Sequence, residues 1–146
     1  MIYQFSIYHH VIEKGKIMPD LDEPTYWKSL INIGLSKFFV LKILYEGPSY
    51  GYEILKQVAD LTDGCCTPTV GTIYPILTRL TKDGYARILK ISNTEGGRQR
   101  KIYTLTPKGK KTYKIALEAW RSTLPYIYKA IDFEYVDEEG EEACCD

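Results

Sequence analysis

Apolar residues recur at helical spacing in four stretches of the chain, and the first begins near Asp22-Glu23-Pro24-Thr25 and runs to about Tyr45. Its apolar positions form two stripes, Trp27, Ile31, Leu35, Phe38 and Leu41 on one and Leu30, Ile33, Val40 and Leu44 on the other. Glu46-Gly47-Pro48 ends this helix, because glycine suits the left-handed cap and proline cannot continue the helix. A small domain covers one face only, so we expect the second face to meet a partner subunit.

Two further amphipathic stretches predict a helix-turn-helix. The first is set by Tyr50, Ile54, Val58 and Leu61 and closes at Asp63-Gly64. The second has Thr69 as its predicted N-cap and ends at Asp83-Gly84. Its predicted buried positions are Val70, Ile73, Leu77 and Leu80. The short turn between the two makes the second one the predicted recognition helix.

The pattern then changes to one that favours strands. Residues 85–91 and 101–105 are rich in β-branched and aromatic residues, and Asn93-Thr94-Glu95-Gly96-Gly97 between them is typical of a turn. Tyr103 and Leu105 alternate toward the expected core. A helix followed by a hairpin with a basic tip is typical of a winged helix.

Thr106-Pro107 predicts the start of a last helix, with threonine as N-cap and proline in the first turn. A heptad seam follows, formed by Tyr113, Leu117, Trp120, Leu124, Ile127 and Ile131. Since the winged helix already has a core, we expect this seam to contact a second copy of the chain. Pro125 predicts a bend or break near Arg121 to Leu124, recapped by Ser122 or Thr123.

The expected fold class is mainly α with a small β-hairpin (α+β), a winged helix-turn-helix plus a C-terminal dimerisation helix. The predicted boundaries are 1–22 for an N-terminal extension, 23–106 for the DNA-binding domain, 107–133 for the dimerisation helix and 134–146 for an acidic, disordered tail. The extension is either disordered or a non-native leader, in which case Met18 is the natural start.

Charge adds a functional direction to this pattern. The 146 residues hold 19 basic and 19 acidic side chains, yet residues 69–114 hold 11 basic and 2 acidic ones, leaving 8 and 17 for the remainder. The predicted recognition helix and hairpin therefore form a basic half, which is expected to face phosphate. The length of the chain favours one hydrophobic core. The sequence has no apolar run long enough for a membrane span, so we expect a cytoplasmic protein. The basic half gives the expected partner, double-stranded DNA.

Burying one face of the recognition helix leaves Thr72, Pro75 and Arg79 opposite, flanked by Gly71, Thr78 and Lys82. Arginine can bond guanine in bidentate fashion in the major groove, and a threonine methyl can meet thymine. Tyr74 lies at the edge of this face, where packing and a phosphate contact are both open. Arg98 and Arg100 are expected at the hairpin tip, near phosphates or the minor groove. The candidate DNA-binding residues are Thr69, Gly71, Thr72, Tyr74, Pro75, Thr78, Arg79, Lys82, Arg98 and Arg100.

Metal and catalytic chemistry find little support in the sequence. His9-His10 have no further ligands nearby, and the pairs Cys65-Cys66 and Cys144-Cys145 lack the CxxC spacing of a zinc knuckle. We read the four thiols as reduced bystanders, with a thiol- or metal-sensing regulator as the alternative. No phosphate loop and no nucleophile with a paired histidine is evident, so we expect no enzyme, no metal and no cofactor.

Three stretches together resemble the PadR family of bacterial transcriptional regulators. They are Glu46 to Glu53, Thr69 to Gly84 with its GTIYPILTRL run, and Gly96 to Thr106 with GGRQRKIYTLT. The resemblance extends over roughly residues 31–131 and implies a homodimeric winged-helix repressor on a palindromic operator, often responsive to a small molecule. The alternative is a winged-helix module that binds protein instead of DNA.

Leu117-Glu118-Ala119-Trp120 is similar to a segment of the short, LmrR-like subgroup of this family, in which tryptophans stack on planar drugs. That resemblance implies a planar aromatic effector at Trp120, Ala116, Leu117, Phe38 and Ile31. From the residues alone, Trp120 lies in the middle of the seam, where a broad aromatic face suits a flat ligand or simply fills a dimer core. Leu124 stands where the subgroup has an acid, which weakens the case for a cationic ligand.

Overall fold

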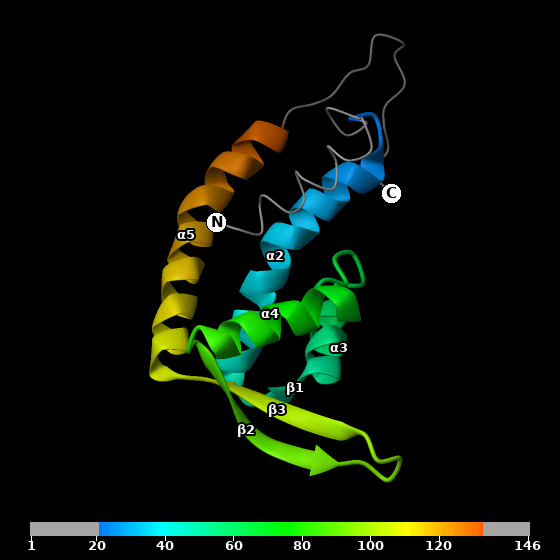
Figure 1. Cartoon of the computed structure of the whole chain (residues 1–146). Coiled ribbons are helices and arrows are strands. Elements are labelled where there is room, and N and C mark those ends of the chain that lie inside the picture. Colours follow the sequence, from blue (N-terminus) through cyan, green and yellow to red (C-terminus); the bar gives the residue numbers. More distant parts are fainter. Residues whose placement is uncertain (1–20, 133–146) are drawn as a thin grey trace, which may run out of the picture.

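The structure is a computed structural model that describes residues 21–132. The elements run in the order α2 (Pro24–Glu46), β1 (Ser49–Tyr50), α3 (Gly51–Leu61), α4 (Val70–Lys82), β2 (Ala86–Asn93), β3 (Gln99–Leu105) and α5 (Pro107–Ile131). Met18, His9-His10, the acidic tail and Cys144-Cys145 lie outside the described residues. Mainly helical with a small antiparallel sheet, this is the predicted winged-helix arrangement (Figure 1).

One hydrophobic core joins all the helices to the base of the hairpin. It is built from the second half of α2, the inner faces of α3 and α4 and the start of α5, with Ile73, Leu77 and Leu80 facing inward as predicted. Val70, also expected to be buried, is 58% exposed. Core contacts of α4 begin at Ile73, so the first turn of the helix projects beyond the core. Leu61 differs from expectation in the same way, since it ends α3 at the surface.

The sheet has a third strand that the sequence pattern did not predict. β3 pairs antiparallel with β2 on one side and with the two-residue β1 on the other, where Ser49 lies opposite Tyr103. Between Ile88 and Lys90 the register with β3 shifts by a β-bulge. Tyr103 and Leu105 are buried, as the alternation predicted. The strand β1 ties the start of α3 to the base of the hairpin.

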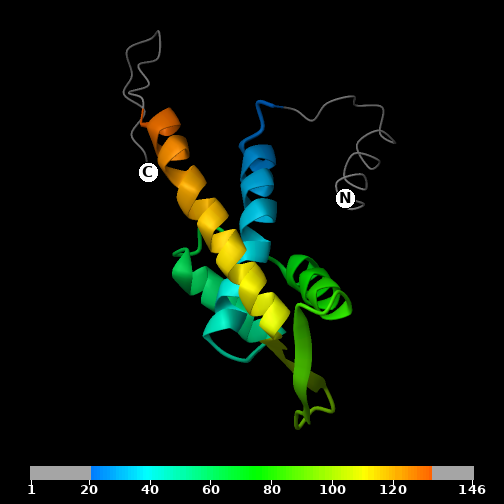
Figure 2. The ribbon, with the colours of Figure 1, turned by 90° about the vertical axis from the view of Figure 1, so that its left-hand side faces the viewer.

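The helix α2 is buried along one half only. From Ser36 to Leu44 it contributes to the core, whereas Trp27, Leu30, Ile31 and Ile33 remain exposed. Figures 1 and 2 show the first half of α2 and the second half of α5 rising away from the sheet. Its ends lie where predicted, with proline in the first turn and Gly47 as C-cap, but the expected left-handed cap is wrong because Gly47 is extended, with φ 170° and ψ 168°.

The helix α5 runs without interruption from Pro107 to Ile131, so of the bend or break predicted near Arg121 to Leu124 the break is wrong. Pro125 has no N–H for the carbonyl of Arg121, but residues 121–130 are exposed and water can hydrate that carbonyl. Figure 1 shows the helix curving in this half. Both the Ser122 and the Thr123 hydroxyl donate to the Ala119 carbonyl, at 3.0 and 2.8 Å, so neither starts a new helix.

A close junction joins the end of α4 to the start of α5. The Thr106 hydroxyl caps α5 by accepting from the Gly109 N–H at 3.2 Å, and it donates to the Gly84 carbonyl at 2.7 Å. Lys108 Nζ donates to the Asp83 carbonyl at 2.8 Å and lies 4.2 Å from the centre of the Tyr85 ring. The recognition helix therefore cannot shift at this end without moving α5.

Candidate nucleic-acid interface

The recognition helix α4 presents a polar face because its apolar positions are fixed in the core. Thr69 is the N-cap as predicted, and its carbonyl accepts from the N–H groups of Thr72 and Ile73 at 2.9 and 3.0 Å. Its hydroxyl makes no cap bond and instead lies 3.2 Å from that of Thr72. The predicted DNA-facing residues of α4 are exposed except for Thr72, which is half-buried: Gly71, Tyr74, Pro75, Thr78, Arg79 and Lys82.

Arg79, the predicted base-reading residue, is paired within its own helix. Its Nε lies 2.5 Å from Oδ2 of Asp83, one helical turn later. More than half of the Arg79 side chain is exposed, and an exposed pair of this spacing stabilises a helix by only about 0.3 to 0.5 kcal/mol. The pair aligns the guanidinium along the exposed face and can exchange for a stronger acceptor at little cost.

Tyr74 at the edge of the face is positioned by a glycine on the neighbouring helix. A Cβ on Gly51 would lie 2.8 Å from Cζ of the Tyr74 ring, so only glycine lets the ring lie this close to the start of α3. The ring is nevertheless partly exposed. Packing explains where Tyr74 sits, and its exposed part leaves a phosphate contact open.

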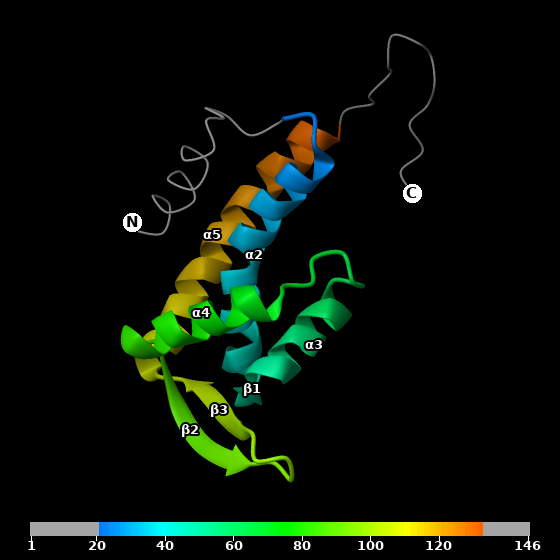
Figure 3. The same ribbon diagram turned by 45° about the vertical axis from the view of Figure 1, so that its right-hand side comes forward.

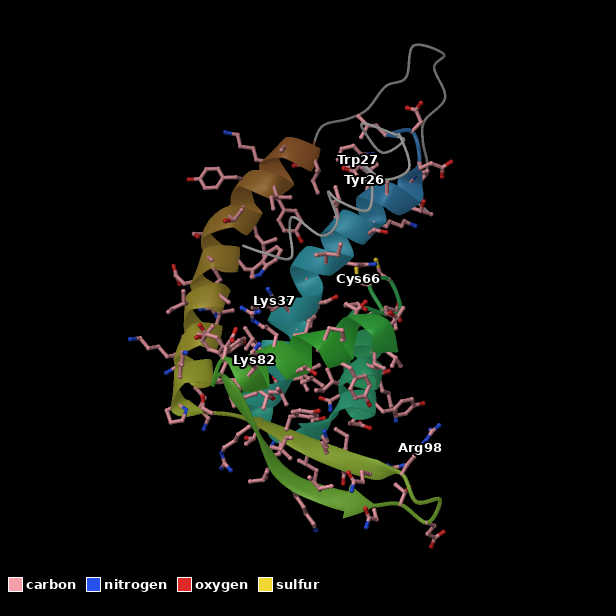
Figure 4. The ribbon with its side chains drawn as sticks, viewed as in Figure 1. Tyr26, Trp27, Lys37, Cys66, Lys82 and Arg98 are labelled. Atoms are coloured by element: carbon pink, nitrogen blue, oxygen red, sulfur yellow. The ribbon has the colours of Figure 1, made fainter. Side chains whose placement is uncertain are left out.

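The wing positions its two predicted arginines differently. Its turn is closed by Thr94, whose N–H and hydroxyl both donate to the Arg98 carbonyl at 2.9 and 3.1 Å, and Gly97 adopts a positive φ of 72°. Arg98 lies at the tip and points outward (Figure 4). Arg100 was predicted there too, but it lies within β3 opposite Ser92, with its guanidinium 5.8 Å from the centre of the Tyr50 ring.

Further basic side chains in the wing and in the first turns of α5 are also exposed: Arg87, Lys90, Lys101, Lys108, Lys110, Lys111 and Lys114. In Figure 3 the hairpin extends below α4, so recognition helix and wing border one end of the molecule. Within residues 21–132, the structure has no group of three or more His, Cys, Asp or Glu side chains that could hold a metal ion. In the same range, none of the helices combines the length and the apolar character needed to cross a membrane.

The predicted seam on α5 divides into an inner and an outer part. Tyr113 is only 8% exposed and packs inside its own chain, with ring centroids 4.6 Å from Tyr45 and 6.0 Å from Phe38, so its predicted contact with a second copy stays a prediction. Leu117 and Trp120 are half-buried, whereas Leu124, Ile127 and Ile131 are exposed. Tyr113 is enclosed in this way because the start of α5 packs against α2.

The predicted effector residues come together in part. Phe38 and Trp120 lie with ring centroids 5.8 Å apart, tilted by 50°, and Ala116 and Leu117 pack at the edge of the same core. Ile31 is exposed, nearly two helical turns before Phe38 on α2. Among residues 21–132, Phe38 is therefore an aromatic neighbour of Trp120.

Sequence reasoning missed the contacts that arise only between elements. Lys108 and Asp83, which join α5 to α4, and Tyr50, which lies under Arg100, belong to separate segments with no shared pattern. A signal did exist for the Arg79 pair, since Asp83 stands four residues later on the same helix.

A comparison with known protein families matches residues 40–115 to the transcriptional regulator PadR-like family. The chain belongs to this family. The match covers α3, α4, the hairpin and the parts of α2 and α5 that pack on them. This PadR-like chain therefore belongs to a family of transcriptional regulators.

Individual relatives agree with that assignment. This PadR-like chain is 37% identical to the transcriptional regulator YqjI of Escherichia coli over 76 residues. These aligned residues make up 52% of this chain and 34% of the relative. The chain thus spans about a third of the length of this curated relative.

Solved structures of similar proteins cover more of the chain. A transcriptional regulator from Clostridium thermocellum, Cth-833, is 37% identical with a TM-score of 0.57, covering 67% of this chain and 91% of that one. TA0346 from Thermoplasma acidophilum, a putative transcriptional regulator, has a TM-score of 0.61 at 27% identity, covering 70% and 96%. Bacillus subtilis PadR, solved in complex with operator DNA, has a TM-score of 0.51 at 27% identity, covering 56% and 45%.

Proposed function

We propose that this protein is a DNA-binding repressor that acts as a homodimer on a palindromic operator and responds to a small-molecule effector. The observation that carries the DNA part is the exposed polar face of α4 beside a basic wing. A helix of this kind enters the major groove with its side chains against base edges, while wing and flanking lysines meet phosphates. That a PadR relative is solved with operator DNA supports the same reading.

Within this interface we assign different roles to the arginines. Arg79 reads a base, because it can leave the Asp83 carboxylate for the bidentate acceptor pair of guanine. Arg98 contacts the DNA phosphate backbone from the tip of the wing, and Arg100 contacts it from β3, beside Tyr50. Thr69, Gly71, Thr72, Tyr74, Pro75, Thr78 and Lys82 complete the proposed contact face.

A selection of bound duplexes from a random pool, followed by titrations at several salt concentrations, tests this assignment. Arg79→Ala should weaken binding to the selected site by about 1 to 3 kcal/mol and relax the preference at one base pair. Arg98→Ala should weaken binding to all sequences alike and reduce the slope of log K against log salt by about 1.

The matched control is Lys129→Ala, which removes one exposed positive charge near the far end of α5. It should leave both affinity and slope nearly unchanged. If Lys129→Ala weakens binding as much as Arg79→Ala and Arg98→Ala do, net charge alone explains the effect and the proposed face is wrong. A weak, salt-independent affinity would instead favour the protein-binding alternative.

The dimer proposal rests on exposed apolar side chains that a single chain leaves uncovered. Trp27, Leu30, Ile31 and Ile33 on α2 and Leu124, Ile127 and Ile131 on α5 lie in the two helical halves that rise from the core. Exposed apolar surface of this kind is typical of protein interfaces. A second copy that covered both halves would also set the spacing of two recognition helices, roughly 34 Å for successive major grooves.

The effector proposal rests on Trp120 and its contact with Phe38. Half-buried beside the outer part of the seam, Trp120 offers an aromatic face to a planar ligand held between α2 and α5 of two subunits, with Ala116, Leu117 and Ile31 around it. A flat aromatic dye such as Hoechst should quench tryptophan fluorescence and release DNA. In a Trp27→Phe background, Trp120→Ala should abolish the binding of the dye while leaving the dimer intact; dye binding that survives Trp120→Ala would contradict the site.

A further inference from the structure

The loop between α3 and α4 holds two adjacent cysteines whose sulfurs face each other. Sγ of Cys66 lies 3.4 Å from Sγ of Cys65. Cys65 is exposed and Cys66 is half-buried, and both are free thiols. Figure 4 labels Cys66 in this loop, beside the start of the recognition helix. The two side chains form a small dithiol surface that a molecule from solution can reach.

The turn around these cysteines has a defined backbone. Asp63 and Gly64 adopt positive φ values of 50° and 76°, which reverse the chain at the end of α3. The Cys65 N–H then donates to the Thr62 carbonyl at 3.0 Å. Similarly, the Cys66 N–H donates to the Thr62 hydroxyl at 3.3 Å, and this hydroxyl donates to the Val58 carbonyl at 2.8 Å. Thr62 thereby anchors both cysteines to the last turn of α3.

A disulfide between the two sulfurs is disfavoured. Consecutive Cα atoms across a trans peptide lie about 3.8 Å apart, whereas disulfides join Cα atoms about 4.4 to 6.8 Å apart. Burial, and after it the hydrogen bond and charge of Cys65, raise the pKa of the Cys66 thiol. A raised pKa keeps the thiolate scarce, and the thiolate is the form that attacks in disulfide formation.

Within the described residues, the two thiols alone do not make a zinc site either. Structural zinc sites have four protein ligands and catalytic ones have three. In the part of the chain that the structure describes, no third His, Cys, Asp or Glu joins the pair in a metal-binding group. Within residues 21–132 the pair thus offers two ligands, which match an atom with two exchangeable bonds.

We propose that Cys65 and Cys66 form a binding site for a monosubstituted trivalent arsenical, R–As(OH)2. Two S–H bonds and two As–O bonds break, two As–S bonds form, and the thiol protons leave with the hydroxides as two water molecules. Arsenic stays trivalent and both sulfurs stay reduced, so no oxidant or reductant is needed. Two sulfurs bonded to one atom at about 2.3 Å, as in zinc thiolates, lie roughly 3.3 to 3.8 Å apart for bond angles of about 90 to 110°. The observed sulfur separation falls in this range.

The position of the site gives the arsenical a route to the DNA face. Cys66 is followed by Thr67, whose hydroxyl donates to the Gly64 carbonyl at 3.4 Å, and by the buried Pro68, after which Thr69 caps α4. Closing a ring across Cys65 and Cys66 fixes the backbone immediately before this cap. The arsenical is therefore an effector that acts on the recognition helix; this regulatory part rests on the proposed DNA binding, while the binding of arsenic does not.

The binding test uses phenylarsine oxide and the full chain carrying Cys144→Ser and Cys145→Ser, so that only Cys65 and Cys66 remain. Intact mass after gel filtration in excess glutathione should show one phenylarsine per chain, and thiol titration should show the loss of two thiols. Adding either Cys65→Ser or Cys66→Ser should weaken retention by roughly 10²- to 10⁴-fold, the usual gain from a second linked contact. Far-UV circular dichroism checks that each variant is folded.

Two outcomes would overturn the site: equal retention with one of the two thiols removed, or no retention once Cys144 and Cys145 are replaced. The regulatory part has its own readout, since the arsenical should release selected DNA from the Cys144→Ser/Cys145→Ser protein and not from its Cys65→Ser derivative. Unchanged DNA binding with arsenic bound would refute the regulation and leave the site standing. Failure of the apo protein to bind DNA would refute only the proposed function.

Discussion

Gly109 in the first turn of α5 is the residue at which a single methyl group should do the most damage. A Cβ at this position would lie 1.9 Å from the Tyr85 carbonyl oxygen, 2.9 Å from its carbonyl carbon and 3.0 Å from Cδ2 of Leu105. The same carbonyl oxygen accepts from the Thr106 N–H at 3.0 Å and lies 3.2 Å from the Thr106 hydroxyl oxygen. Gly109→Ala therefore pushes on backbone atoms that are already held in place.

The expected change in the free energy of unfolding combines two destabilising contributions and one stabilising contribution. Overpacking a tight site costs about 1 to 3 kcal/mol, and here backbone has to move because the nearest atoms are not at the end of a flexible side chain. Moving Gly109 also strains the N-cap bond from its N–H to Thr106, which is worth about 1 kcal/mol. Alanine regains about 1 kcal/mol of helix propensity. We expect a net loss of about 1 to 3 kcal/mol in the free energy of unfolding.

Urea unfolding followed by circular dichroism, at one fixed protein concentration, measures this difference. The matched control is Gly34→Ala in α2, where an added Cβ meets no atom within 4 Å. The control should gain up to about 1 kcal/mol through the same helix propensity. If Gly109→Ala unfolds at the same urea concentration as Gly34→Ala or above it, the close approach of α5 to Tyr85 is not a constraint and the reasoning fails.

Two further predictions concern a buried phenol and the outer seam. Burial, and after it the charge of Tyr74, raise the pKa of Tyr103, so on raising the pH the unfolded chain loses this proton before the folded chain does, and stability should fall above about pH 10. Tyr103→Phe should flatten that fall in urea midpoints measured against pH, with the exposed Tyr126→Phe as the control. An unaltered fall in Tyr103→Phe would refute the prediction. Ile127→Asp, which places a charge on the exposed seam, should give folded monomers in sedimentation experiments. The control Ile115→Asp, at an exposed position of α5 outside the seam, should leave the protein dimeric. Dimers in both variants would place the interface elsewhere.

Local signals in the sequence were sufficient for most of the secondary structure. Pro24, Asp83-Gly84 and Thr106-Pro107 set helix ends through φ preferences and capping, which depend on neighbouring residues only. Period and turn chemistry also predicted the recognition helix, the hairpin and the exposure of Arg79 and Arg98. These features need no knowledge of the rest of the fold, because hydrogen bonds within a helix or hairpin are made between residues close in sequence.

Only the tertiary structure decided which residues of each stripe the core takes and which distant groups meet. Val70 and Tyr113 both fit their helical periods, yet one projects past the core and the other is enclosed by α2. The strand β1 is too short to show a period and exists because β3 offers it a free edge. Contact of Gly109 with Tyr85 depends on how two elements dock, a long-range arrangement that local preferences do not encode. Thr62 holds the backbone N–H groups of Cys65 and Cys66 in a turn, and the two sulfurs lie 3.4 Å apart there, so adjacency in sequence identified the pair and the fold alone made it a site.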